Sequence, residues 1–276
     1  MHNLLAMDQD ELETLLTGWG QPRFRARQLH QWVHDRKVSE FTAMHTLPQG
    51  LRERLERECC IGSLQLDTEQ RAADGTVKRL YRLSDDQLIE SVLMPYSSGR
   101  RTACISSQAG CAMGCVFCAT GQMGFIRQLR AEEIFEQAYI FSRELESQGE
   151  RLSNVVLMGM GEPFHNYGPV LEAVERIMSE LGIGARHITI STVGLVKRIR
   201  EFADRGLQVT LAISLHAATD EARSAMMPIN QRHDLDELIE ACRYYVDKTN
   251  RRVTFEWALI AGENDSQEEA QRLSRL

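Results

Sequence analysis

The sequence Thr102-Ala-Cys-Ile-Ser-Ser-Gln-Ala-Gly-Cys-Ala-Met-Gly-Cys-Val-Phe-Cys118 places three cysteines on one short loop after a predicted strand. Cys111, Cys115 and Cys118 have the spacing C-x3-C-x2-C. Thiolates held this close can each bind a different iron of a cubane [4Fe–4S] cluster, because the loop wraps one face of the cluster. Three protein ligands leave the fourth iron open to an exogenous ligand, which favours chemistry over simple electron storage.

Two other uses of these thiols fit the sequence less well. A structural zinc site needs four ligands, usually from two paired knuckles, and the chain has no second Cys-x2-Cys pair. His165 or Cys104 would have to complete the tetrahedron, which leaves zinc as the minor alternative. Disulfides are disfavoured because seven cysteines is an odd count and residues 1–16 do not resemble a secretory signal. This cysteine usage predicts a reducing, cytoplasmic location.

The composition is that of an ordinary soluble globular protein. A chain of 276 residues can bury a sizeable core, and 43% hydrophobic with 26% charged residues is typical of such chains. No apolar stretch approaches the length of a membrane span, so we expect no membrane contact. The net charge of −7 argues against general coating of nucleic acid, but it leaves room for local basic patches.

Two kinds of secondary structure are predicted before residue 97. Apolar spacing predicts helices over Asp10–Leu16, Gln21–Val33 and Pro48–Arg57. Alternating residues then predict strands over Leu64–Arg71, Val77–Leu83 and Leu88–Met94, with a hairpin turn at Asp74-Gly75. We therefore expect residues 1–96 to form an N-terminal accessory module, a small helical part followed by a short antiparallel sheet.

From Arg101 onward, predicted strands alternate with amphipathic helices. The strands are Thr102–Ser106, Asn154–Gly159, His187–Thr192, Val209–Leu215 and Val253–Ile260. The helices are Ala131–Leu145, Pro169–Leu181, Val193–Arg205, Leu235–Thr249 and one that starts near Ser266. This alternation is typical of parallel βαβ units and predicts an α/β fold, an open or partial barrel over residues 97–276.

Polar or glycine-rich segments lie at the carboxyl ends of four of these strands. In chain order they are the cysteine loop, Met158–Pro163, Ser191–Gly194 and Ser214–Ala217. Active groups of such barrels lie at the carboxyl ends of the strands. One glycine-rich turn would mean little, but four beside a candidate cluster loop predict a cofactor pocket.

These segments resemble the RlmN/Cfr family of radical S-adenosylmethionine (SAM) RNA adenosine methyltransferases. The similarity is densest in Cys104–Gly121, Met158–Pro163, Leu211–Ala217 and Met227–Asn230. The cysteine spacing alone identifies only the superfamily, whereas Cys104-x-Ser-Ser-Gln108 and Ser214-Leu-His-Ala217 are specific to the family. The resemblance implies a partial (β/α)6-type radical-SAM barrel, incomplete at the C-terminus, after the N-terminal module.

The resemblance also implies the cofactors and the residues that bind them. The three cysteines would hold a [4Fe–4S] cluster whose open iron binds SAM. Gly161 and Glu162 would contact the methionine amino group of SAM. Its carboxylate, ribose and adenine would be held by Ser191, Ser214, Leu215 and His216. Taken alone, His216 is better interpreted as a core histidine, and its place at a strand end favours the pocket.

Two further residues have catalytic roles in the family. Adenine C2 is electron-poor, so the family places a methyl group on a cysteine, activates it with the 5′-deoxyadenosyl radical and adds it to the ring. Glu90 aligns with the residue that accepts the C2 proton. Cys104 aligns with the thiol that releases the product as a disulfide bond forms.

The methyl-carrying cysteine of the family lies near the C-terminus. This chain ends at Leu276 inside a predicted helix, and Cys59, Cys60 and Cys242 do not match that position. Cys242 is better interpreted as a helix core residue. We therefore expect a truncated sequence that binds the cluster but does not complete methyl transfer.

The resemblance implies 23S rRNA and tRNA as partners, gripped by the N-terminal module. A basic face there would consist of Arg23, Arg25, Arg27, Arg36 and Lys37. A reductase or flavodoxin-type electron donor and a monomeric state are also expected. Two alternatives stay open: Cfr-type methylation at C8, and a non-catalytic iron–sulfur RNA-binding module.

Overall fold

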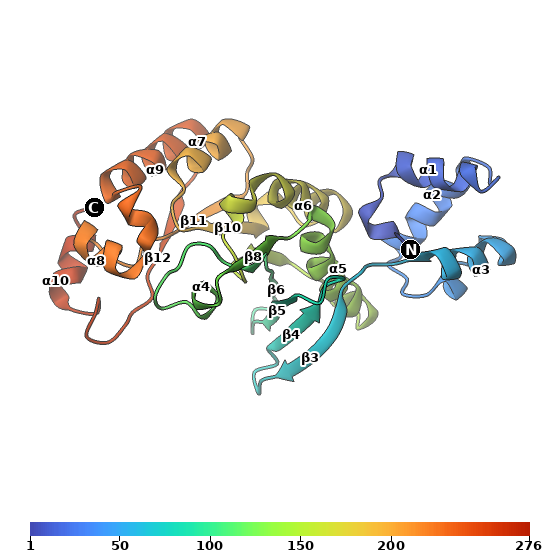
Figure 1. Ribbon diagram of the computed structural model, residues 1–276, viewed down its shortest axis with the longest axis horizontal. Coiled ribbons are helices and arrows are strands. Elements are labelled where there is room, and N and C mark those ends of the chain that lie inside the picture. The colour runs from blue at the N-terminus through green and yellow to red at the C-terminus, as the bar shows by residue number, and fades with distance from the viewer.

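A computed structural model describes residues 1–276. A group of N-terminal helices lies at one end of the molecule and the C-terminus at the other (Figure 1). This helical module contains α1 (Gln9–Gly18), α2 (Phe24–His30) and α3 (Gln49–Glu58), closed by a short parallel pair of β1 (His2–Asn3) and β2 (Cys59–Cys60). Asp8 starts α1 by accepting from the Glu11 backbone N–H at 2.8 Å, a capping box that satisfies free helix donors.

The rest of the chain is organised by one eight-stranded sheet in the order β12-β11-β10-β9-β6-β5-β4-β3. Its strands are β3 (Gln65–Arg71), β4 (Val77–Arg82), β5 (Leu88–Pro95), β6 (Arg101–Cys104), β9 (Asn154–Leu157), β10 (Ile188–Thr192), β11 (Thr210–Ser214) and β12 (Val253–Glu256). Strands β6 and β9 to β12 are parallel, and β3 to β5 are antiparallel. Because β3 and β12 remain edges, the predicted partial barrel is confirmed.

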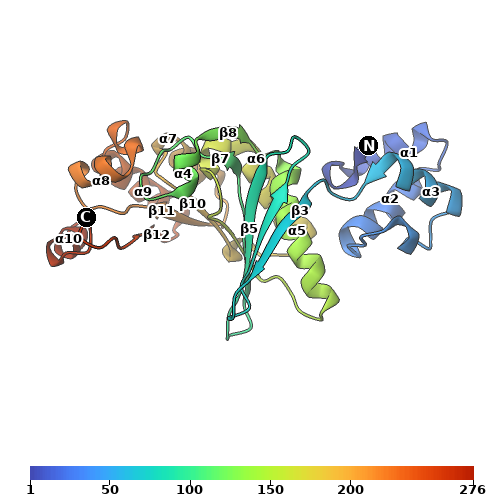
Figure 2. The same ribbon diagram turned by 60° about the horizontal axis from the view of Figure 1, so that its bottom comes forward.

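Helices cover one face of this sheet. They are α5 (Ala131–Ser147), α6 (Tyr167–Glu180), α7 (Val196–Arg205) and α9 (Leu235–Thr249), and α10 (Gln267–Leu273) follows near the end (Figure 2). Val155, Leu157 and Ile190 are fully buried beneath the helices. The alternating residues Val156 and Thr189 are only half-buried, because they point to the other face, called here the open face.

The predicted boundary at residue 96 falls inside the sheet. Strands β5 and β6 lie on either side of it and pair, with Val92 opposite Cys104 and Pro95 opposite Arg101. The antiparallel strands therefore extend the core sheet and are not part of a separate N-terminal module. The helical module joins the sheet through residues 61–64, where the Glu136 carboxylate accepts from the Ser63 and Leu64 backbone N–H groups at 2.8 and 2.9 Å.

The helical module is attached to the core by polar contacts. Tyr139 donates to the Val33 carbonyl at 2.6 Å, and His34 lies 2.7 Å from a Glu180 carboxylate oxygen. Lys37 is buried and pairs with Glu146 at 2.8 Å. The prediction that Lys37 belongs to an exposed basic face is therefore wrong, because its ammonium is used at this interface.

Several short elements were not predicted. They are β7 (Gln108–Gly110), β8 (Phe125–Gln128), α4 (Ala119–Met123) and α8 (Asp220–Met226). Each is too short to show a clear period in the sequence. The last predicted strand also ends early, at Glu256, whose carbonyl accepts from the Leu215 and His216 N–H groups of the neighbouring loop. None of the helices combines the length and the apolar composition that a membrane span requires.

Candidate active site

A cavity of about 310 Å³ opens at the carboxyl ends of the parallel strands. Its lining includes the three cysteines together with Gly161, Glu162, Ser191, Ser214 and His216. The structure thus brings together side chains from the loops after β6, β9, β10 and β11. This is the edge at which α/β barrels carry their active groups.

The cysteine loop is held at its base and at its tip. The Cys111 N–H donates to the Gly124 carbonyl at 2.9 Å, where β7 and β8 pair antiparallel. Gly110 has φ of +73°, and a Cβ there would lie 2.0 Å from the Gly124 oxygen, so only glycine fits. At the tip, the Val116 N–H donates to the Met226 carbonyl at 3.0 Å, which connects the loop to α8.

Burial keeps the Cys111 and Cys115 thiols in their neutral form. It raises the pKa of Cys111, and burial together with the neighbouring thiols raises the pKa of Cys115 to about 12. Metal ligation requires thiolates, so binding of a metal group must displace these protons. The thiol cluster is therefore a site whose loading depends on pH.

The arrangement of the thiols suits a cluster better than a single ion. No group of three His, Cys, Asp or Glu side chains converges closely enough to hold one metal ion. The two candidates for a fourth zinc ligand are also occupied or remote: His165 contacts Gln108 at 3.0 Å, and Cys104 does not line the cavity. Ligands of a cubane bind separate irons and lie farther apart, around a space such as this cavity.

Glu162 is a buried carboxylate at the cavity wall. Its two oxygens accept from the Phe164 and Val193 backbone N–H groups at 2.9 and 2.8 Å. Burial raises the pKa of Glu162 to about 7 despite these hydrogen bonds. Gly161 before it has φ of +100°, and a Cβ there would lie 2.5 Å from the Gln108 Cβ. The site thus presents an anionic group that gains from a cationic ligand.

His216 has a defined tautomer. Its Nδ1 accepts from the Ala258 backbone N–H at 3.0 Å, and burial lowers the pKa of the ring to about 4. The neutral ring therefore carries its proton on Nε2 and can act only as a donor there. Phe117 of the cysteine loop contacts the ring edge-on, with centroids 4.7 Å apart.

The structure adds two residues to the predicted site and places one predicted residue outside the cavity wall. Ser191 donates to the Glu256 carboxylate at 2.7 Å, so Glu256 at the end of β12 belongs to the site although its sequence context did not indicate it. Leu215 is buried and its side chain does not line the cavity. Asn264, also missed, donates to the His216 and Ala258 carbonyls at 2.8 Å and holds these loops together.

Glu90 and Cys104 lie beside the cavity rather than in its wall. Cys104 is opposite Val92 in the sheet, and Glu90 is two residues from Val92, so both side chains point to the open face. Glu90 pairs with Lys78 at 2.6 Å. Burial raises the pKa of Cys104 to about 11. The two residues are therefore placed on one face, next to the ends of β6 and β9.

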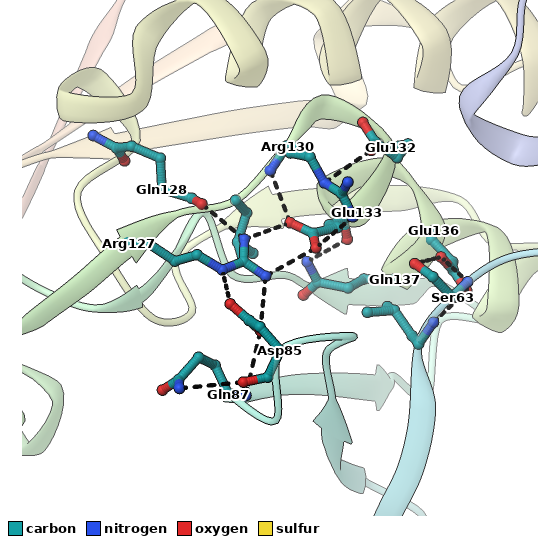
Figure 3. A network of polar contacts seen from close by, with 12 residues as sticks. Ser63, Asp85, Gln87, Arg127, Gln128, Arg130, Glu132, Glu133, Glu136 and Gln137 are labelled. Atoms are coloured by element: carbon teal, nitrogen blue, oxygen red, sulfur yellow. Dashed lines mark hydrogen bonds and ion pairs between the residues drawn. The ribbon is translucent and has the colours of Figure 1, made fainter. Parts of the chain in front are cut away.

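Helix α5 fixes the segments around Glu90 and Cys104. Gln137 accepts from the Ser106 N–H and the Ser91 hydroxyl, both at 2.8 Å. Ser106 in turn donates to the Glu90 carbonyl at 2.5 Å and accepts from the Met160 N–H at 2.8 Å. Figure 3 shows Gln137 beside Glu133 and Glu136 on the same helix, with Glu133 contacting Arg127 and Glu136 contacting Ser63. One buried face of α5 thus contacts residues 61–64, strand β5 and the segment that follows Cys104.

Fold and site together define a protein of the radical SAM superfamily. The model of the radical SAM superfamily matches residues 105–273, and the model of the ribosomal RNA large subunit methyltransferase N-terminal domain matches residues 2–61. A crystal structure of a radical SAM methyltransferase from Sphaerobacter thermophilus is 45% identical and superposes with a TM-score of 0.92, covering 100% of this chain and 81% of that chain. Membership of the superfamily implies SAM and an iron–sulfur cluster as cofactors.

The curated relatives narrow this class to one family. The probable dual-specificity RNA methyltransferase RlmN of Halalkalibacterium halodurans is 43% identical over 99% of this chain and 76% of its own length. The protein of the same name from Symbiobacterium thermophilum is 48% identical over 99% of this chain and 74% of its own length. The chain belongs to the RlmN family of radical SAM RNA methyltransferases.

Proposed function

We propose that this protein methylates C2 of an adenosine in 23S rRNA and of an adenosine in the tRNA anticodon loop. The relatives named dual-specificity RNA methyltransferases support two RNA substrates. The observation that carries the proposal is one cavity lined by three thiols, a buried carboxylate and a histidine donor, with Glu90 and Cys104 beside it on the open face.

In this proposal Cys111, Cys115 and Cys118 hold a [4Fe–4S] cluster. When bound, the cluster and SAM supply a 5′-deoxyadenosyl radical. Glu162 accepts a hydrogen bond from the ammonium group of SAM, which favours its ionised form. His216 donates from Nε2, while Ser191 and Ser214 bind polar atoms of the same ligand from neighbouring strand ends.

The two residues on the open face act on the RNA. Glu90 accepts the proton from C2, with the ion pair to Lys78 holding its carboxylate on that face. Cys104 is the thiol that attacks the sulfur of the family's methyl-carrying cysteine, a position that Cys59, Cys60 and Cys242 do not match. The S–S bond forms as the bond from that sulfur to the RNA-bound carbon breaks, and this carbon takes the electron pair and a proton to leave the methylated RNA. Because the pKa of Cys104 is about 11, its attack requires removal of a proton in the same step or by a nearby base.

In this proposal the helical module binds the RNA, and the target base extends from there to the open face of the sheet. Its basic side chains include Arg23, which is largely exposed, and Arg36, which lies over the Trp32 ring at 4.2 Å. The target base must leave its stack to reach the strand ends. An electron donor of the reductase or flavodoxin type, and a monomeric state, remain part of the proposal.

Mass spectrometry of rRNA and tRNA nucleosides tests the proposed function. Cells that carry the gene are compared with cells in which it is deleted, and 2-methyladenosine is expected only in the first. A gain of 8-methyladenosine would assign the Cfr-type reaction instead. Cluster and RNA binding without any methylated adenosine would favour the non-catalytic module.

A further inference from the structure

Arg223 is a buried cation without a carboxylate partner. Its side chain on α8 is 1% exposed, and no acidic residue pairs with it. Its guanidinium donates to the Val193 carbonyl at 2.7 Å, to Asn230 Oδ1 at 2.8 Å, and to the Ser214 and Leu215 carbonyls at 3.2 Å. Neutral oxygens thus satisfy its hydrogen bonds. The Asp220 carboxylate is connected to it only through Asn230, which accepts from Arg223 at 2.8 Å and donates to Asp220 at 2.9 Å, so the guanidinium has no direct ion-pair partner.

A buried charge without a direct ion-pair partner is costly, and proteins usually pair it or neutralise it. Burial lowers the pKa of Arg223 to about 10, which still leaves it charged at neutral pH. Carbonyl dipoles offset only part of the lost hydration. Such a cation is best explained by an anion that occupies the neighbouring site in the working protein.

The neighbouring site is the cluster cavity. Val193, Ser214 and Met227 line the cavity, and Arg223 contacts the first two through their carbonyls. The next residues of α8 accept from the cysteine loop, since Met226 binds the Val116 N–H at 3.0 Å. The guanidinium therefore lies directly behind the wall that faces the thiolates.

We propose that Arg223 is the counter-charge of the iron–sulfur cluster and raises its reduction potential. A cubane with three thiolates is anionic and becomes more so on reduction, and net charge near a cluster is one determinant of its potential. A fixed cation favours the reduced form. The inference rests on the proposed function, because it requires the cluster at Cys111, Cys115 and Cys118.

Redox titration of the anaerobic holoenzyme, followed by electron paramagnetic resonance, tests the proposal. Removing the charge in Arg223→Gln should lower the ratio of reduced to oxidised cluster at a fixed potential about tenfold, equivalent to about 59 mV for one electron. Arg223→Lys keeps the charge and should change the ratio much less. Arg232→Gln, at an exposed position on the neighbouring turn, is the matched control and should leave it unchanged.

A second variant leaves Arg223 and its hydrogen bonds in place. Cys242 is buried on α9, and the charge of Arg223 lowers its pKa against the larger opposing effect of burial. Cys242→Asp would put a carboxylate within electrostatic reach of the guanidinium and offset its charge, so the reduced fraction should again fall, whereas Cys242→Ser should not change it. The Cys242→Asp and Cys242→Ser variants test the role of the Arg223 charge even if the Arg223→Gln variant does not bind a cluster.

Each outcome bears on a distinct claim. The role of the charge would be overturned if Arg223→Gln and the unmodified protein had equal reduction potentials. It would also be overturned if the Gln and Lys variants shifted the potential equally. Arg223 would then only hold the loops in place through its hydrogen bonds. An unchanged potential in Cys242→Asp would overturn it as well. Absence of any cubane signal in the unmodified protein would refute the proposed function before the variants are compared.

Discussion

The pH dependence of SAM binding should report directly on Glu162. The carboxylate is 2% exposed, and its pKa of about 7 lies well above that of a free glutamate because burial disfavours the charge. At about pH 7 about half of the free protein carries the anion, and at about pH 6 about a tenth does. If the ammonium of SAM requires the anion, its affinity should fall about fivefold between these two pH values.

The substitution Glu162→Gln gives the size of the interaction. A hydrogen bond to a charged group contributes about 1.5–3 kcal/mol, and ionising a half-protonated carboxyl costs about 0.4 kcal/mol. The dissociation constant at about pH 7 should therefore rise by about 6-fold to about 70-fold. The variant should also lose the fivefold dependence on pH, because a glutamine does not titrate.

Isothermal titration calorimetry on the anaerobic holoenzyme measures both quantities. Proton release on binding adds a second readout, since the bound ammonium should lower the pKa of Glu162 and release about half a proton at about pH 7. Glu256→Gln is the control, because it changes the other carboxylate of the cavity and should keep the pH dependence. A Glu162→Gln variant with unchanged affinity and the same pH slope would refute the reasoning.

Three further outcomes are expected. Cys115→Ser should lower the iron content after anaerobic reconstitution from about four per chain to less than about one, and stoichiometric zinc in the unmodified protein would contradict the cluster. Cys104→Ala, expressed from the gene in cells, should accumulate a covalent RNA adduct on denaturing gels, and normal turnover would exclude the resolving role. Gly161→Ala should lower the melting temperature, because a Cβ at φ of +100° meets Gln108 and such strain costs on the order of 1–3 kcal/mol. Gly18→Ala, which meets nothing within 4 Å, is its control.

Much of the site could be predicted because its signals are local. The three thiols lie within eight residues, so their spacing alone brings them onto one loop. Gly161, Glu162, Ser191, Ser214 and His216 follow strand ends, and parallel strands carry these ends to one edge. The placement of these residues in one cavity agrees with the prediction, whereas their proposed roles await the experiments above.

Other features depend on contacts between distant segments. Glu256 meets Ser191 across 65 positions of sequence, and Lys37 meets Glu146 across 109. Neither partner can be read from neighbouring residues, because strand register and helix docking determine them. The same limit explains why the sheet was expected to stop near residue 96: hairpin pairing is local, but the pairing of β5 with β6 depends on how the sheet assembles.

The amino-acid sequence by itself determined the alternation of strands and helices, the cysteine loop and the family, since periodicity and motif spacing are properties of adjacent residues. Only the tertiary structure decided which carboxylate is buried with a raised pKa, which nitrogen of His216 carries the proton, and that Arg223 lies unpaired behind the cavity. Burial and hydrogen bonding set these properties, and both arise only when segments far apart in the chain are brought into contact.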